Sequence, residues 1–215
     1  MTWHETERAW LADTLRATAY DAPTLCAGWQ ARHLAAHLVL RERAPRAGAG
    51  AVGTVATRGP GAATERLAAT VEGPEDYAAL VDTFAAPPPR WSPLAWAGDA
   101  VNASEYFIHT EDLRRGAGPA EPRALPDGLR DLLWGQLLRM APVRLRRLGP
   151  GVVLVRPDDL RSAVHRARGG HGTVVLRGEV GELVLAVSGR LQAADVTVEG
   201  APDDVAAVRE LLTGP

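Results

Sequence analysis

Glu105 and His109 are the two residues of this sequence whose types and spacing most clearly suggest chemistry. They lie four residues apart between Asn102 and Asp112, so a helix there would place them one above the other on a single face. Ile108 shares that face, which indicates partial burial. A buried carboxylate is costly unless a cation or a metal ion compensates its charge. The spacing therefore suggests a compensating partner elsewhere in the chain.

Two histidines earlier in the chain could supply that partner. His33 and His37 lie in a segment from residue 30 to 43 whose apolar positions predict a helix. His37 belongs to both apolar stripes of this helix, so it is the better candidate for an inward position. Two ligands spaced i and i+4 on one helix, with a third from a facing helix, form a metal site that keeps a position open for water or substrate. The pattern predicts such a site from His37, Glu105 and His109, with His33 as a fourth candidate.

Each of these residues also has an ordinary structural interpretation. Glu105 and His109 could form an ion pair on a helix surface, and an inward histidine is often a hydrogen-bonded core residue. Asp112 could orient the His109 ring from behind, as carboxylates next to metal ligands do, or it could pair with Arg115. Cys26 could be a small buried residue or take part in the site. As the only cysteine, it excludes an intramolecular disulfide and a multi-cysteine zinc site.

The elements that must position these residues follow from periodicity and turn signals. We expect a Gly- and Ala-rich loop from residue 45, and a change from helical to strand periodicity at Gly149-Pro150-Gly151. The predicted helices are 3–20, 30–43, 62–71, 74–84, the segment around 102–115, 125–148 with a kink at Pro142, 178–188 and 202–212; the predicted strands are 152–156, 173–177 and 195–198. The predicted fold class is α+β, with a bundle of about four helices in residues 1–149 and a small α+β domain in residues 150–215.

The composition is that of an ordinary globular protein, with 46% hydrophobic and 23% charged residues. A net charge of -2 gives no indication of a nucleic-acid partner. All basic residues are arginines, so clusters such as Arg144, Arg146 and Arg147 are weak evidence for a phosphate site. Neither a secretory signal nor an apolar stretch of membrane-spanning length is visible. We therefore expect a cytoplasmic monomer or homodimer with no membrane partner.

Three motifs in order resemble a known family. The segment from Leu25 through Gly28-Trp29 to His37-Leu38 resembles the corresponding segment of DinB-like metal-binding four-helix bundles, and more closely the mycothiol-dependent maleylpyruvate isomerase family. The segment from Glu105 to Arg114 is similar to that family's second signature, a glutamate and a histidine four apart followed by an aspartate. Gly178–Leu183 followed by Ser188-Gly189-Arg190 is similar to its C-terminal part. The resemblance thus covers nearly the whole chain.

The resemblance implies a divalent metal, zinc first of all, held by His37, Glu105 and His109. It also implies mycothiol, a low-molecular-weight thiol, as co-substrate, and an isomerase or S-transferase reaction on a small substrate. Arg190 matches a family arginine that faces the bundle site, and it would hold an anionic group of the substrate. Its ordinary interpretation is a surface arginine that closes a helix.

Two rival functions remain open at the level of sequence. The metal could be purely structural, in which case chelation should lower the melting temperature while no thiol binds. Alternatively, the C-terminal domain could carry a small apolar ligand and the histidines could be structural. Thiol binding that depends on metal separates the enzyme from the structural metal. Binding of a fluorescent fatty-acid probe that chelation leaves unchanged would favour the carrier.

Overall fold

The computed structural model describes residues 2–44 and 61–213, which form two compact units that divide after Ala120. Helices dominate both units, and the second also holds a four-stranded sheet, so the predicted α+β class is confirmed. The domain boundary predicted at residue 149 falls inside the second unit, because the helix before it packs with the elements that follow. Most of the predicted loop from residue 45 lies outside the described residues.

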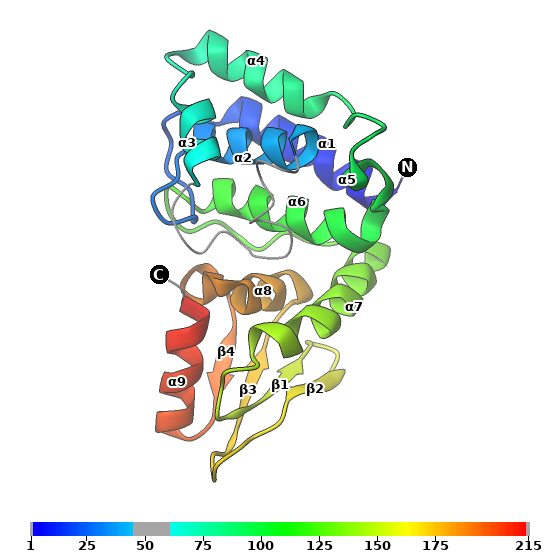
Figure 1. Ribbon diagram of the computed structural model, residues 1–215. Coiled ribbons are helices and arrows are strands. Elements are labelled where there is room, and N and C mark those ends of the chain that lie inside the picture. Colours follow the sequence, from blue (N-terminus) through cyan, green and yellow to red (C-terminus); the bar gives the residue numbers. More distant parts are fainter. Residues whose placement is uncertain (1, 45–60, 214–215) are drawn as a thin grey trace. The chain divides into compact units, whose positions relative to one another are not determined.

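Four longer helices build the first unit: α1 (Trp3–Ala17), α2 (Ala31–Arg43), α4 (Pro74–Ala85) and α6 (Gly98–Arg114). Two short helices, α3 (Ala62–Ala68) and α5 (Pro93–Trp96), complete it (Figure 1). Helix α1 packs along both α6 and α4, while α2 packs against α4 and α3. The two helices predicted to carry the metal ligands, α2 and α6, therefore belong to the same unit.

Local sequence explains where these helices start. Thr2 and Glu5 form a capping box at the start of α1, as their spacing indicates, and Pro74 occupies the first turn of α4. The buried side chains between the helices are mostly large and apolar, which drives their packing. Fully buried members of this core include Leu11, Leu15, Leu34, Leu38, Phe84 and Tyr106.

The second unit holds a mixed sheet with strand order β2-β1-β3-β4. Its strands are β1 (Gly151–Val155), β2 (Arg161–His165), β3 (Thr173–Arg177) and β4 (Thr197–Glu199). β1 and β3 pair in parallel, and the outer pairings are antiparallel. Helix α7 (Asp127–Arg144) packs on β2, and α9 (Pro202–Thr213) packs on β3. A short helix α8 (Val180–Leu185) contacts α7 and continues into a π-helical turn, Ala186–Arg190, and a 3-10 turn, Leu191–Ala193 (Figure 1).

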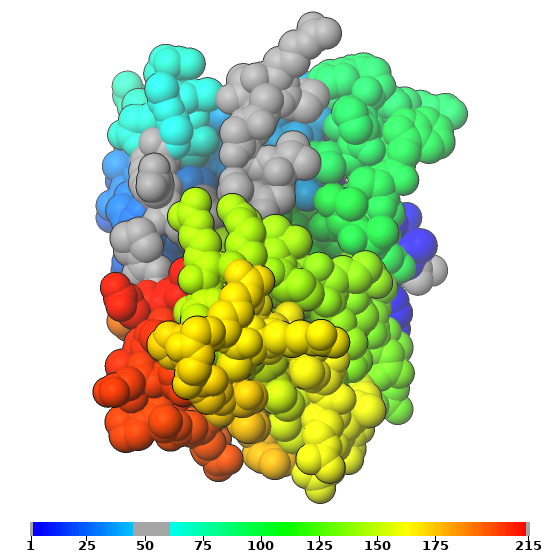
Figure 2. Space-filling model, turned by 60° about the horizontal axis from the view of Figure 1, so that its bottom comes forward, coloured from blue at the N-terminus to red at the C-terminus, as the bar shows by residue number. Residues whose placement is uncertain are grey.

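One strand was not predicted from the sequence. β2 alternates poorly, since its first three residues are exposed or half-buried and only Val164 and His165 are buried. The segment around it, drawn in yellow in Figure 2, lies on the surface of the second unit. Its neighbour β1 is almost entirely buried, which explains why β1 was recognisable as a strand and β2 was not.

None of the helices in the described parts of the chain is both long enough and apolar enough to cross a membrane.

Candidate metal centre

Both predicted histidine ligands lie close to one carboxylate oxygen of the third predicted ligand, Glu105. Oε1 of Glu105 lies 3.5 Å from Nε2 of His37 and 3.3 Å from Nε2 of His109. These separations are longer than most hydrogen bonds between nitrogen and oxygen. They match the spacing of about 3.4 Å between neighbouring ligand atoms that each lie 2.0–2.1 Å from a tetrahedral centre. The donor set, two imidazoles and one carboxylate, is therefore one that could hold a divalent metal ion.

The site is shielded from solvent. The side chains of His37 and His109 are 8% and 3% exposed, and Glu105 is 23% exposed. The His37 ring packs against Trp29 and His109, with ring centroids 5.2 and 5.3 Å away. The Gly28-Trp29 motif that precedes α2 thus supplies one wall of the site. Glu105 is the member of the trio most open to solvent.

The electrostatics of the trio follow from this burial. Burial alone would raise the pKa of Glu105, but contacts with His109, His37 and Arg41 outweigh it and hold the pKa well below its ordinary value. Burial lowers the pKa of His37 and keeps that imidazole neutral. The pKa of His109 is instead raised well above its ordinary value, because its contacts with Asp112, Cys26 and Glu105 overcome the effect of burial. His37 is therefore neutral, and His109 is held in place by the acceptors around it.

Asp112 holds the His109 ring from the side opposite Glu105. Its Oδ2 lies 2.9 Å from Nδ1 of His109 and accepts a hydrogen bond from Sγ of Cys26 at 3.1 Å. The side chains of Asp112 and Cys26 are buried. With Nδ1 held by Asp112, Nε2 of His109 faces Glu105, and it is the atom that would bind a metal ion after losing its proton. Asp112 is thus in the position that orienting the His109 ring requires.

His33 does not join the trio. Its Nδ1 accepts a hydrogen bond from the backbone N–H of Gln30, and its Nε2 lies 3.5 Å from a carboxylate oxygen of Glu65 on α3. The first contact is part of a capping box at the start of α2. His33 therefore serves the helix that carries His37. This role could have been anticipated, because His33 is the third residue of the helix.

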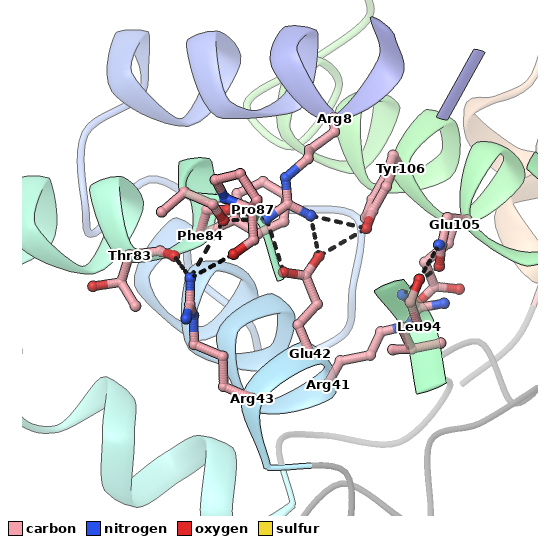
Figure 3. Close-up of polar contacts among 12 residues, drawn as sticks. Arg8, Arg41, Glu42, Arg43, Thr83, Phe84, Pro87, Leu94, Glu105 and Tyr106 are labelled. Carbon is pink, nitrogen blue, oxygen red and sulfur yellow. Dashed lines mark hydrogen bonds and ion pairs between the residues drawn. The ribbon is translucent and has the colours of Figure 1, made fainter. Parts of the chain in front are cut away.

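Arg41 is a member of the site that spacing alone did not reveal. Its Nε lies 3.3 Å from Oε1 of Glu105, the same atom that faces both histidines. It follows His37 by one helical turn, so the pattern i, i+4 on α2 contained a usable signal. Its neighbour Glu42 points the other way, toward Arg8 and Tyr106, as Figure 3 shows.

Arg190 lies in the second unit, at the end of the π-helical turn. It is buried, so its interpretation as a surface residue is wrong, and its Nη1 donates a hydrogen bond to the backbone carbonyl of Ser188 at 2.7 Å. Gly189 within this turn has a φ of 90°, a conformation that favours glycine. A role for Arg190 at the metal site stays a prediction.

Comparison with known proteins identifies a shared fold. No protein-family model and no curated protein sequence matches the chain. Two crystal structures are similar over 93% of this chain and 92% of theirs. One is a mycothiol-dependent maleylpyruvate isomerase in which a histidine is mutated to alanine (TM-score 0.60, 19% identity), and the other is a mycothiol-dependent maleylpyruvate isomerase (TM-score 0.55, 18% identity). The chain is thus distantly related in structure to these isomerases.

Proposed function

We propose that the first unit binds a divalent metal ion, preferably zinc, through His37, Glu105 and His109. The observation that carries this proposal is the convergence of both histidine Nε2 atoms on one oxygen of Glu105 at 3.3–3.5 Å. Three protein ligands of these types are characteristic of catalytic zinc sites, which leave a further position for water or substrate. The orientation of His109 by Asp112 supports the proposal, since metal-bound histidines usually have such a partner.

We further propose that the protein is an enzyme that uses a low-molecular-weight thiol such as mycothiol, as an isomerase or an S-transferase. The similar fold of two mycothiol-dependent isomerases and the order of the three motifs support this reaction class. A bound zinc ion would supply a nucleophile near neutral pH by lowering the pKa of a thiol or a water. Arg190 would hold an anionic group of the substrate through paired hydrogen bonds.

The protein side chains have distinct tasks in this scheme. Asp112 keeps the proton of His109 on Nδ1, and His109 gives up its Nε2 proton when it acts as a ligand. His37 is kept neutral by its burial, and it would bind through Nε2 as the tautomer that carries its proton on Nδ1. Trp29 and the apolar core of the unit exclude water from behind the histidines. Glu105, the most exposed ligand, lies where a substrate could approach.

A second candidate function is a structural metal ion that links α2 to α6. The near-complete burial of His37 and His109 favours it, because structural sites are closed to solvent. The apolar-ligand carrier stays a prediction from the sequence.

Metal analysis tests the metal proposal directly. The protein is purified without chelators or a metal-affinity tag, offered zinc, and compared with the variants Glu105→Gln and Glu65→Gln. Glu65 is a matched control, because it also lies 3.5 Å from a histidine of α2 but outside the trio. We expect one zinc per chain in the wild type and in Glu65→Gln, and almost none in Glu105→Gln. Metal-free wild-type protein would refute the site.

Calorimetric titration with mycothiol separates the enzyme from the structural alternative. If the protein is a thiol-dependent enzyme, the zinc-loaded protein should bind mycothiol, and this binding should disappear after chelation. A structural ion predicts no thiol binding, with a melting temperature that falls sharply on chelation.

A further inference from the structure

Arg41 is the one cationic side chain whose contact with the trio is direct in the described residues of the first unit. Its Nε lies 3.3 Å from Oε1 of Glu105, and its side chain is 6% exposed. Its guanidinium group lies 6.0 Å from the centre of the Tyr106 ring. Arginine is rarely buried unless its charge is compensated, because burying an unpaired charge is costly.

A chain of hydrogen bonds fixes the position of this guanidinium group. Nη1 of Arg41 donates to Oδ1 of Asn102 at 3.1 Å, and Nδ2 of Asn102 donates to the backbone carbonyl of Leu94 at 2.9 Å. Three helices, α2, α6 and α5, thus contribute to its placement. Figure 3 shows Arg41 extending from α2 toward Glu105 and Leu94, while Arg43 extends in another direction, toward Thr83 and Pro87. These contacts fix the guanidinium group of Arg41 beside Glu105.

The need to neutralise the negative charge of Glu105 does not explain Arg41 once a metal ion is bound. A divalent ion would neutralise Glu105 by itself, and Arg41 would then repel the ion. An arginine that weakens metal binding is explained if it serves a third component of the site. Within the first unit, Glu105 and Asp112, the two carboxylates in contact with His109, together balance the charge of a divalent ion. Arg41 therefore leaves the loaded site with one positive charge.

We infer that Arg41 is a specificity-determining residue that reserves the open position of the site for an anionic ligand. The inference rests on the metal site proposed above and extends it to the class of ligand. A thiolate or a carboxylate would bring the charge of the site to zero, whereas a neutral ligand would leave the buried positive charge uncompensated.

The test uses cobalt(II) in place of zinc, because its visible spectrum reports ligand entry. Wild type, Arg41→Gln, Arg41→Lys and Arg43→Gln are each titrated with azide, a small anion, and with imidazole, a neutral ligand. Arg43→Gln is the matched control, since Arg43 is on the same helix and donates to the carbonyls of Thr83, Ala86 and Pro87. We expect Arg41→Gln to weaken azide binding about tenfold and to change imidazole binding less than twofold.

Two further results are expected. Arg41→Lys keeps the charge and should retain azide affinity within about threefold, and Arg43→Gln should leave both titrations unchanged. The affinity of Arg41→Gln for zinc should stay the same or rise, because a cation beside the ion has been removed. If Arg41 were purely structural, Arg41→Gln should instead lose both metal affinity and stability.

Several outcomes would overturn the inference while leaving the metal site intact. They are unchanged azide affinity in Arg41→Gln, an equal loss of azide and imidazole affinity, or loss of cobalt from Arg41→Gln while the wild type keeps it. Failure of the wild type to bind cobalt or zinc would instead refute the proposed function, and this inference with it. The two failures are therefore distinguishable in one experiment.

Discussion

Nδ1 of His109 and Oδ2 of Asp112 lie 2.9 Å apart, one turn apart on α6, and the same oxygen accepts a hydrogen bond from Cys26. This contact fixes the orientation of the His109 ring, so that its Nε2 faces the candidate metal centre. A carboxylate behind a ligating histidine commonly contributes a factor of 10 to 100 in metal affinity.

Removal of Asp112 should therefore weaken the metal site without removing a ligand. We expect Asp112→Ala to lower zinc affinity by a factor of about 10 to 100, measured by competition with a chromogenic chelator. Asp112→Asn keeps an acceptor and should have a smaller effect. Asp13→Ala, a change of the same type on the exposed face of α1, is the control and should leave affinity unchanged. Equal affinities in Asp112→Ala and Asp13→Ala would contradict the assigned role.

The two histidines of α2 should respond differently to substitution. We expect His37→Ala to abolish stoichiometric zinc binding, because it removes one of three ligands, and His33→Ala to retain one zinc per chain. His33→Ala should cost about 1 kcal/mol of stability instead, since it removes a contact with the backbone N–H of Gln30 at the helix start. Metal analysis and urea denaturation measure the two effects. Loss of zinc from His33→Ala alone would reassign the ligand.

The ion pair between Arg8 and Glu42 should be important for stability and independent of the metal. The Glu42 side chain is fully buried, and Arg8 donates to both of its oxygens at 2.5 and 2.8 Å (Figure 3). Glu42→Ala leaves the Arg8 side chain, which is only 11% exposed, without its carboxylate, so we expect a loss of about 3–5 kcal/mol in urea denaturation. The double variant Arg8→Met, Glu42→Leu should be less destabilised than Glu42→Ala.

An exposed carboxylate gives the scale for that measurement. Asp82 pairs with Arg16 while 70% exposed, so Asp82→Ala should cost less than about 1 kcal/mol. If Glu42→Ala is no worse than Asp82→Ala, the buried pair contributes nothing beyond a surface pair.

The second unit should lose stability in acid through Asp204. Hydrogen bonds from His171 and from the backbone of Gly172, both at 2.8 Å, lower the pKa of Asp204 below its ordinary value of 3.8. A depressed pKa contributes stability above the unfolded value, and that contribution is lost as the pH falls through the folded pKa. Urea denaturation between pH 5 and pH 2 should show a shallower loss for Asp204→Asn than for the wild type. Asp203→Asn, the exposed neighbour, should behave as the wild type.

Local patterns were sufficient to predict much of the fold. The capping box of Thr2 and Glu5, the proline that opens α4, and the apolar runs of β1 and β3 identified those elements correctly. The polar strand β2 lacked such a signal, because its stability comes from pairing with β1. The grouping of α7 with the second unit was also missed, since amphipathicity shows that a helix has a buried face but not which partner covers it.

The candidate site shows the same limit. The helical spacing of Glu105 and His109 put them on one face, and the inward stripe of α2 selected His37 over His33; the structure brings these three together. Arg41 follows His37 by one helical turn, but its contact with Glu105 and that of Cys26 with Asp112 depend on side-chain positions between separate elements, which the sequence does not give. Metal binding by the trio stays a prediction.

The burial of Cys26 has a practical consequence. The chain holds a single cysteine. Its side chain is 2% exposed, and its thiol donates a hydrogen bond to Asp112. A thiol reagent can react with it only when the turn before α2 opens away from α6, so the labelling rate reports the opening equilibrium at that position. Cys26 can therefore serve as a kinetic probe of this opening. Any ligand that binds the closed form should slow the labelling of Cys26 in proportion to its affinity.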